Sequence, residues 1–93
     1  MISCDGDRCT VKGPITLDNA VALLARGNEL FAVPQVTVDL GAVTEVDSSA
    51  LSLLLEWRRE AGRQGRTIRY LNLPANLNSL AQLYGVTELI SAE

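Results

Sequence analysis

The sequence predicts an α/β domain in which a small mixed β-sheet carries its helices mainly on one face. Short segments of alternating apolar and polar residues, typical of half-buried strands, take turns with longer segments whose apolar residues recur at helical spacing. The chain has 93 residues, below the usual size of about 100 to 200 residues per domain. We therefore expect one layered unit over residues 1–93 without a second lobe.

The chain opens with an expected β-hairpin and a helix. Residues 2–4 and 9–12 alternate between apolar and polar side chains, and residues 5–7 supply the turn. Gly13-Pro14 is expected to end the second strand, and Thr16 to cap the helix. The buried stripe of this helix is predicted to contain Ala20, Leu23, Leu24, Gly27 and Phe31.

Gly27 lies inside the first predicted helix, where glycine is unfavourable. It costs about 1 kcal/mol relative to alanine in a helix interior. We therefore expect Gly27 to mark close packing of the helix on the sheet.

The centre of the chain predicts a strand, helix, strand unit. Residues 36–40 are rich in β-branched side chains, and Gly41 is expected to break that strand. A helical pattern follows up to Gln64, and residues 68–73 form the next strand, which should lie parallel to the first. The helix buries one face, formed by Ala50, Leu53, Leu54, Trp57 and Ala61.

A last helix is expected to begin after Pro74 and to end at Gly85. Its apolar stripe contains Leu77, Leu80, Ala81 and Tyr84. Residues 86–90 should pack back on the domain.

Composition argues against several classes of function. The chain carries 8 basic and 11 acidic residues, a net charge of −3, so we expect no general electrostatic grip on nucleic acid or an anionic bilayer. It contains no histidine, the commonest general base and metal ligand, and no phosphate-binding loop or nucleophile-elbow motif. Asp39, Glu45 and Asp47 could cluster, but carboxylates without a cleft are a weak sign of catalysis. We expect no enzyme, cofactor or metal site, and a small hydrolase ranks below any binding function.

The predicted location is the cytosol. The longest apolar run, residues 53–55, is far shorter than the ~20 residues of a membrane span, and the first residues lack the pattern of a signal peptide.

Cys4 and Cys9 could face one another across the hairpin. In a reducing compartment, however, two small buried thiols are the favoured interpretation.

The start of the central helix is the candidate functional site. Partners approach open α/β sheets at the carboxyl ends of the strands, where the free N–H groups of the following helix also lie. Ser48 would occupy that positive end of the helix, which suits a phosphate. A structural alternative, compatible with the first, is that Asp47 or Ser48 only caps the helix.

The outward face of the same helix predicts a mixed docking surface. At about 100° per residue, this face lies opposite the apolar face, and Leu51 lies at the margin between them. The outward face consists of Ser48, Ser52, Leu55, Glu56, Arg59 and Arg63. Glutamates interleave the arginines, so a solvated face or an acidic protein partner fits better than nucleic acid.

Residues 36–51 resemble the signature of STAS domains, the family of anti-sigma factor antagonists and of sulfate-transporter cytoplasmic domains. The likeness rests on Val36–Leu40, Val43, Val46 and Asp47–Leu51, and the order of elements matches over nearly the whole chain. The hairpin and residues 80–86 are most similar to the MlaB-like branch. Its members are free-standing STAS subunits of the Mla phospholipid-transport ABC complexes of Gram-negative inner membranes.

The resemblance implies a non-catalytic regulator. MlaB-like subunits bind the cytoplasmic ATPase subunit and support its assembly and activity, through the region that Ser48 matches. The partner-binding residues implied here are Asp47, Ser48, Ser49, Leu51, Ser52, Leu55 and Arg59. In anti-sigma factor antagonists a partner kinase phosphorylates the matching serine, so the alternative is an antagonist with Ser48 as phospho-acceptor. Ala50 stands where many antagonists have glycine.

Overall fold

Four strands form one sheet in the order β1-β2-β3-β4. In the computed structural model, which describes residues 1–90, they are β1 (Ile2–Asp5), β2 (Arg8–Ile15), β3 (Gln35–Val46) and β4 (Thr67–Leu71). β1 pairs antiparallel with β2, whereas β2, β3 and β4 run parallel. The predicted hairpin, the parallel crossover and the mixed sheet are confirmed.

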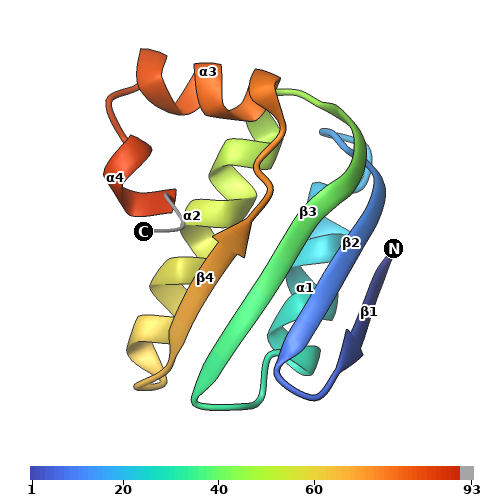
Figure 1. The fold of residues 1–93 in the computed structure, drawn as a ribbon, viewed down its shortest axis with the longest axis vertical. Helices are drawn as coiled ribbons and strands as arrows, with labels where there is room; N and C mark the ends of the chain where they lie inside the picture. The colour runs from blue at the N-terminus through green and yellow to red at the C-terminus, as the bar shows by residue number, and fades with distance from the viewer. Residues whose placement is uncertain (91–93) are drawn as a thin grey trace.

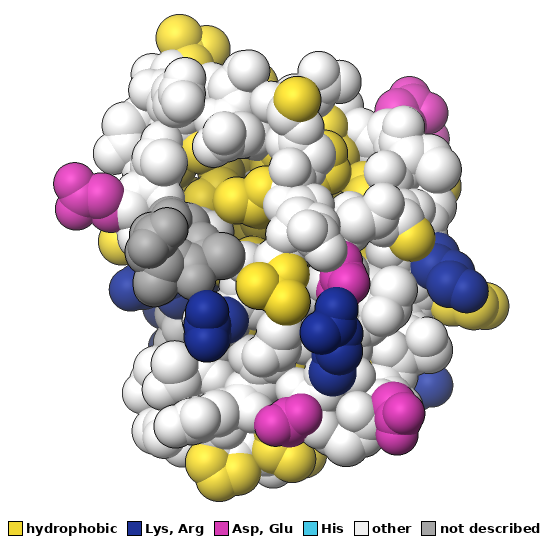
Figure 2. Space-filling model, in the orientation of Figure 1, with side chains coloured by type: hydrophobic (Ala, Val, Ile, Leu, Met, Phe, Trp, Pro, Cys, Tyr) yellow, Lys and Arg dark blue, Asp and Glu magenta, His cyan; other side chains and the backbone are white. Residues whose placement is uncertain are grey.

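Helices α1 (Ala20–Leu30) and α2 (Ser48–Arg63) lie side by side on one face of the sheet (Figure 1). Helix α3 (Ala75–Leu83) lies across the carboxyl end of β4, helix α4 (Thr87–Ile90) lies beside the β4 edge, and both contact α2. The opposite face of the sheet is open, and charged side chains of both signs are scattered over it (Figure 2). The predicted packing of helices mainly on one face is therefore confirmed. No helix within residues 1–90 is long and apolar enough to cross a membrane.

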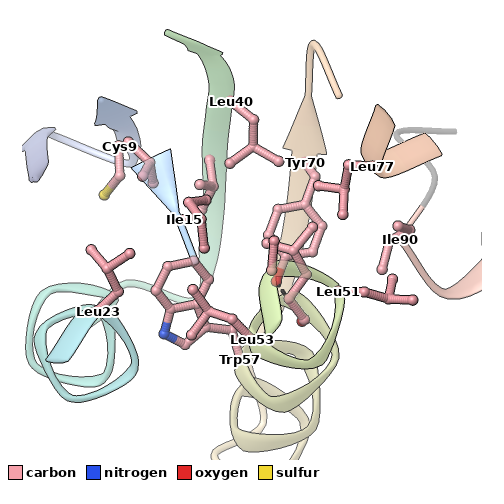
Figure 3. Close-up of a cluster of buried hydrophobic side chains, with 14 of the residues drawn as sticks. Cys9, Ile15, Leu23, Leu40, Leu51, Leu53, Trp57, Tyr70, Leu77 and Ile90 are labelled. Atoms are coloured by element: carbon pink, nitrogen blue, oxygen red, sulfur yellow. Dashed lines mark hydrogen bonds between the residues drawn. The ribbon is translucent and has the colours of Figure 1, made fainter. Parts of the chain in front are cut away.

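The core fills the space between the sheet and α2, as Figure 3 shows. Trp57 and Tyr70 are each 1% exposed, so the predicted burial of Trp57 is confirmed and Tyr70 joins it in the core. The indole N–H of Trp57 donates to the carbonyl of Leu24 at 3.2 Å, and the Tyr70 hydroxyl donates to the carbonyl of Leu54 at 2.7 Å. The polar ends of the two largest buried side chains are thereby satisfied.

The start of the chain departs from the prediction at two points. β2 continues through Gly13 and Pro14, because β1 pairs only as far as Val11 and the outer edge beyond Lys12 has no strand to receive an N–H. The predicted N-cap at Thr16 is also wrong, because a turn occupies residues 17–19 and α1 begins after Asn19. The Asn19 side chain accepts a hydrogen bond from the Thr16 N–H at 2.9 Å, which stabilises that turn.

The predicted strand break at Gly41 is a β-bulge instead. Thr10 pairs with Asp39 and Lys12 with Ala42, so β3 contains one extra residue between the two pairs. The Asp39 carboxylate accepts a hydrogen bond from the Gly41 N–H at 2.8 Å, which satisfies this amide within the irregular ladder. A glycine inside a strand marks a bulge as readily as an end.

The prediction of two free, buried thiols is wrong. Cys4 and Cys9 are direct partners in the hairpin, with their Cα atoms 4.0 Å apart, and they form a disulfide. Cys9 is buried, whereas Cys4 is exposed. The disulfide follows from the hairpin register, which places the two cysteines opposite each other. The prediction from the cellular compartment does not take this register into account.

Gly27 packs tightly, but against α2 and not against the sheet as expected. A Cβ atom built on Gly27 would lie 2.4 Å from the indole nitrogen of Trp57. The glycine therefore lets α1 and α2 approach each other at the largest core side chain.

We predict that Gly27→Ala lowers the free energy of unfolding by about 1 to 3 kcal/mol, because the added methyl overlaps Trp57. Gly62→Ala is the matched control, since Gly62 lies in α2 and a Cβ atom added there would have no foreign atom within 4 Å. Alanine there should raise the free energy of unfolding by about 0.5 to 1 kcal/mol. Urea unfolding curves measure both, and the same sign of change at both positions would contradict the packing described.

Trp57→Ala should cost about 3 to 5 kcal/mol of unfolding free energy, because it empties the centre of the core. The neighbouring Arg58→Ala, at an exposed position, should stay within about 0.5 kcal/mol of the wild type. Calorimetry compares the two variants, and a negligible effect at Trp57 would show that the phase of α2 is wrong.

Candidate functional site

The first turn of α2 is held by Asp47, the residue that links β3 to the helix. Its side chain accepts a hydrogen bond from the Ser49 N–H at 2.8 Å, and its carbonyl accepts one from the Ala50 N–H at 3.0 Å. Of the two predicted caps, Asp47 is therefore the N-cap. Ser48 is the first helical residue, and it is exposed at the positive end of α2.

The second carboxylate oxygen of Asp47 reaches the segment before α1. It accepts a hydrogen bond from the Leu17 N–H at 3.0 Å. The bonds from Leu17 and then Ser49 hold the pKa of Asp47 below its ordinary value of 3.8. We term the paired bonds to Leu17 and Ser49 the Asp47 clamp, because they fix the entry of α1 to the start of α2.

A groove of about 420 Å³ runs between α1 and α2 close to Ser48. Two large apolar side chains lie in solvent near it, with Val21 80% exposed on its α1 side and Leu17 77% exposed next to the clamp. Clustered exposed apolar side chains are typical of partner-binding sites. We define the docking surface as Leu17, Val21, Leu24, Ser48, Ser49 and Ser52.

Of the predicted partner-binding residues, Ser48, Ser49 and Ser52 belong to this surface, Asp47 supports it through the clamp, and Leu55 and Arg59 lie outside it. Ser48, Ser52 and Arg59 are exposed, and Asp47, Ser49 and Leu55 are half-buried. Leu51 is only 5% exposed and belongs to the core. Its assignment to the docking surface is therefore corrected, because α2 turns Leu51 toward the domain interior.

The arginines do not form one basic surface. Arg59 binds Glu56 at 3.0 Å, and Arg63 binds Glu56 at 3.7 Å and also Glu60. Arg66 instead donates to the carbonyl of Phe31 at 2.8 Å. Within α2, charges of opposite sign are paired along a solvated face, where each exposed pair contributes little to stability.

The three carboxylates considered as a cluster do not share one network. Asp39 accepts hydrogen bonds from Asn72 at 3.0 Å and from Gly41, and it pairs with Arg8 at 2.7 Å. These three partners, in the order Asn72, Gly41 and Arg8, lower the pKa of Asp39. Asp47 serves the clamp. Among residues 1–90 no group of three or more His, Cys, Asp or Glu side chains is placed to hold a metal ion.

Leu17 and Val21 are absent from the sequence prediction, which assigns Leu24 to the buried stripe of α1. Val21 lies beside that stripe, which starts at Ala20 and Leu23, and Leu24 is half-buried. An apolar residue outside the buried stripe of a short helix is the available signal, since one stripe is enough to pack α1 on the domain.

The mixed sheet with two helices on one face, and the exposed serine that starts the helix after the third strand, define a STAS domain. A family model described as "Mlab, STAS domain" matches residues 4–91. The chain therefore belongs to the MlaB-type STAS domain family.

Solved structures show the same fold. The anti-sigma factor antagonist SpoIIAA in its unphosphorylated form is 17% identical, with a TM-score of 0.75 over 97% of this chain and 84% of that one. A sulfate transporter family protein from Wolinella succinogenes is 16% identical, with a TM-score of 0.69 over 91% and 70%. Mglu is 22% identical over 81% of this chain with a TM-score of 0.64, but the chain spans only 20% of Mglu. No curated protein matches the chain in sequence.

The Asp47 clamp makes a prediction about pH. Because its folded pKa is lowered, the charge of Asp47 contributes stability that is present above its ordinary pKa of 3.8 and lost as the pH falls below this value. Asp47→Asn keeps a capping oxygen but removes the charge. Its Tm should lie below that of the wild type at neutral pH and converge with it near about pH 2. Thermal melts followed by circular dichroism check this, and a difference independent of pH would contradict the clamp.

Proposed function

We propose that the chain is a non-catalytic, cytoplasmic STAS subunit that binds and regulates the ATPase subunit of an Mla-type phospholipid-transport ABC transporter. Such a transporter would maintain the lipid asymmetry of the outer membrane. The observation that carries the proposal is the exposed Ser48, whose neighbour Ser49 lines the groove between α1 and α2. The family description names the same branch. The chain would sit at the inner membrane through its partner, without inserting into the bilayer.

The docking surface has the chemistry of a protein interface. Val21 and Leu24 of α1 and Leu53 of α2 are apolar residues of the groove lining, and Ser49, Ser52 and Glu56 of α2 are its polar residues. An apolar centre with a polar rim is the usual anatomy of such contacts. A single apolar side chain of the ATPase subunit could occupy the groove, with its backbone near the serine hydroxyls.

Regulation without catalysis requires differential binding. The chain alters the ATPase only if it binds one conformation, or the assembled transporter, more tightly than the alternative. The Asp47 clamp favours tight binding because Leu17 and Ser48 are already fixed relative to each other before the partner arrives. Little conformational entropy is then lost at this part of the interface.

A second candidate is an anti-sigma factor antagonist regulated by phosphorylation of Ser48. It is favoured by the position of Ser48 at an exposed helix start, where N–H groups and the helix dipole stabilise a phosphate. SpoIIAA, an anti-sigma factor antagonist, shares the fold. Incubation with ATP and the cognate kinase should then add one phosphate to Ser48, and an unmodified protein would count against this function.

Substitutions on the docking surface should weaken partner binding without unfolding the chain. We predict that Leu17→Asp and Ser48→Glu each lower the affinity for the ATPase subunit at least about tenfold, because both bury a charge in the contact. Their unfolding free energies should change by about 0.5 kcal/mol or less, since both side chains are exposed. Leu83→Asp is the matched control: Leu83 is 76% exposed on α3, and its substitution should leave the affinity unchanged.

Pull-down of the tagged chain from a native lysate, followed by titration of the purified ATPase subunit, measures these effects. Recovery of the ATPase and permease with the wild type, and their loss with Leu17→Asp, is the expected result. Equal losses of stability and binding in Ser48→Glu would support a purely structural role for Ser48. Recovery of a sigma-regulating kinase without any ABC component would overturn the proposal.

A further inference from the structure

The Cys4–Cys9 disulfide lies at the edge of the sheet. β1 is the outermost strand and pairs only with β2. Cys4 is exposed on that strand, whereas Cys9 is 1% exposed and lies in the core. The bond therefore joins an exposed residue to a protected one, and attack from solvent is expected on the side of Cys4.

We propose that Cys4 and Cys9 form a thiol-responsive latch that reversibly fastens β1 to β2. The inference rests on the proposed function for its setting, the reducing cytoplasm, where the disulfides that do form are usually transient or redox-sensing. The co-reactant is a small cellular thiol or a protein dithiol, together with its disulfide form.

The chemistry is thiol–disulfide exchange. A thiolate attacks the sulfur of Cys4, the exposed residue of the pair, which breaks the Cys4–Cys9 bond, forms a mixed disulfide on Cys4 and releases Cys9 as a thiolate that takes up a proton. A second thiolate attacks the mixed disulfide and releases Cys4, which is protonated in turn. Two external thiols are oxidised to one disulfide, two electrons reduce the latch, and the reverse sequence closes it.

The rest of the hairpin allows the latch to open without unfolding the domain. Ile2 stays anchored in the core, and Met1 and Lys12 exchange backbone hydrogen bonds of 3.0 and 2.8 Å. The disulfide spans a separation of only five residues, so it removes less entropy from the unfolded chain than a disulfide across a longer loop would. Reduction should therefore loosen β1 while β2, β3 and β4 remain paired.

Opening the latch changes what the sheet presents to solvent. β1 covers the outer edge of β2 from Arg8 to Val11, and Ile2 borders a hollow of about 490 Å³ together with residues of α1. When β1 loosens, backbone N–H and C=O groups of β2 lose their partners. An unpaired sheet edge of this kind can pair with another strand. The latch thus controls a protected edge on the side of the sheet away from β4.

The test uses the purified chain alone, in glutathione buffers that range from fully reduced to fully oxidised. Alkylation with mass spectrometry should show complete, reversible conversion between the disulfide and two thiols. Hydrogen exchange of the Ile2–Asp5 amides should be about tenfold faster in the reduced form, because an edge strand opens locally, while that of β3 and β4 is unchanged.

Two single-cysteine variants are matched controls. Cys9→Ala should capture glutathione on the exposed Cys4, whereas Cys4→Ser should leave the buried Cys9 unmodified while folded. Two free thiols in every buffer, a disulfide that resists excess thiol, or equal exchange of β1 in both forms would each overturn the latch. Because no partner is present, these outcomes are distinct from a failure to bind the ATPase subunit.

Discussion

Asp47 accepts hydrogen bonds from the backbone amides of Ser49 and of Leu17, a residue 30 positions earlier in the chain. The first bond supplies the N-cap of α2, and the second ties the approach to α1 to the same carboxylate. Because both oxygens are used, the segment before α1 is tied to the start of α2, where Ser49 and Ser52 line the groove. The exposure of Ser48 depends on this arrangement, since the cap role falls to its neighbour and leaves its hydroxyl to solvent.

Several polar side chains in this domain form hydrogen bonds with backbone groups, whereas two large apolar side chains near the start of α1 are exposed to solvent. Asp39 satisfies the amide of a bulge glycine, Asn19 holds the turn before α1, and Arg66 caps the carbonyl of Phe31. In contrast, Leu17 and Val21 remain in solvent although the core is closed. Leaving large apolar side chains exposed costs solubility, so their retention beside an exposed helix start favours a partner surface.

The sequence predicts helices and strands whose apolar residues recur at regular spacing. The prediction fails where the structure depends on a residue that is distant in the sequence. Trp57 is identified as core because the apolar positions of α2 recur regularly. Gly41 requires knowledge of the β2 register, since the same glycine ends a strand or forms a bulge depending on its partner. The disulfide depends on hairpin register, and Leu51 lies at the margin of the apolar arc, where α3 and α4 decide its burial. The docking leucine at position 17 stands outside any helix, so helical spacing alone gives it no role.

Hydrogen exchange of the chain, free and bound to the purified ATPase subunit of the transporter, locates the partner on the domain. Binding at the docking surface should protect two segments, residues 17–24 and residues 48–52, which meet at the Asp47 carboxylate. The amides of β4 and of the open sheet face should exchange at unchanged rates. Protection confined to the sheet face, or to α3 and α4, would contradict the placement of the partner at the start of α2.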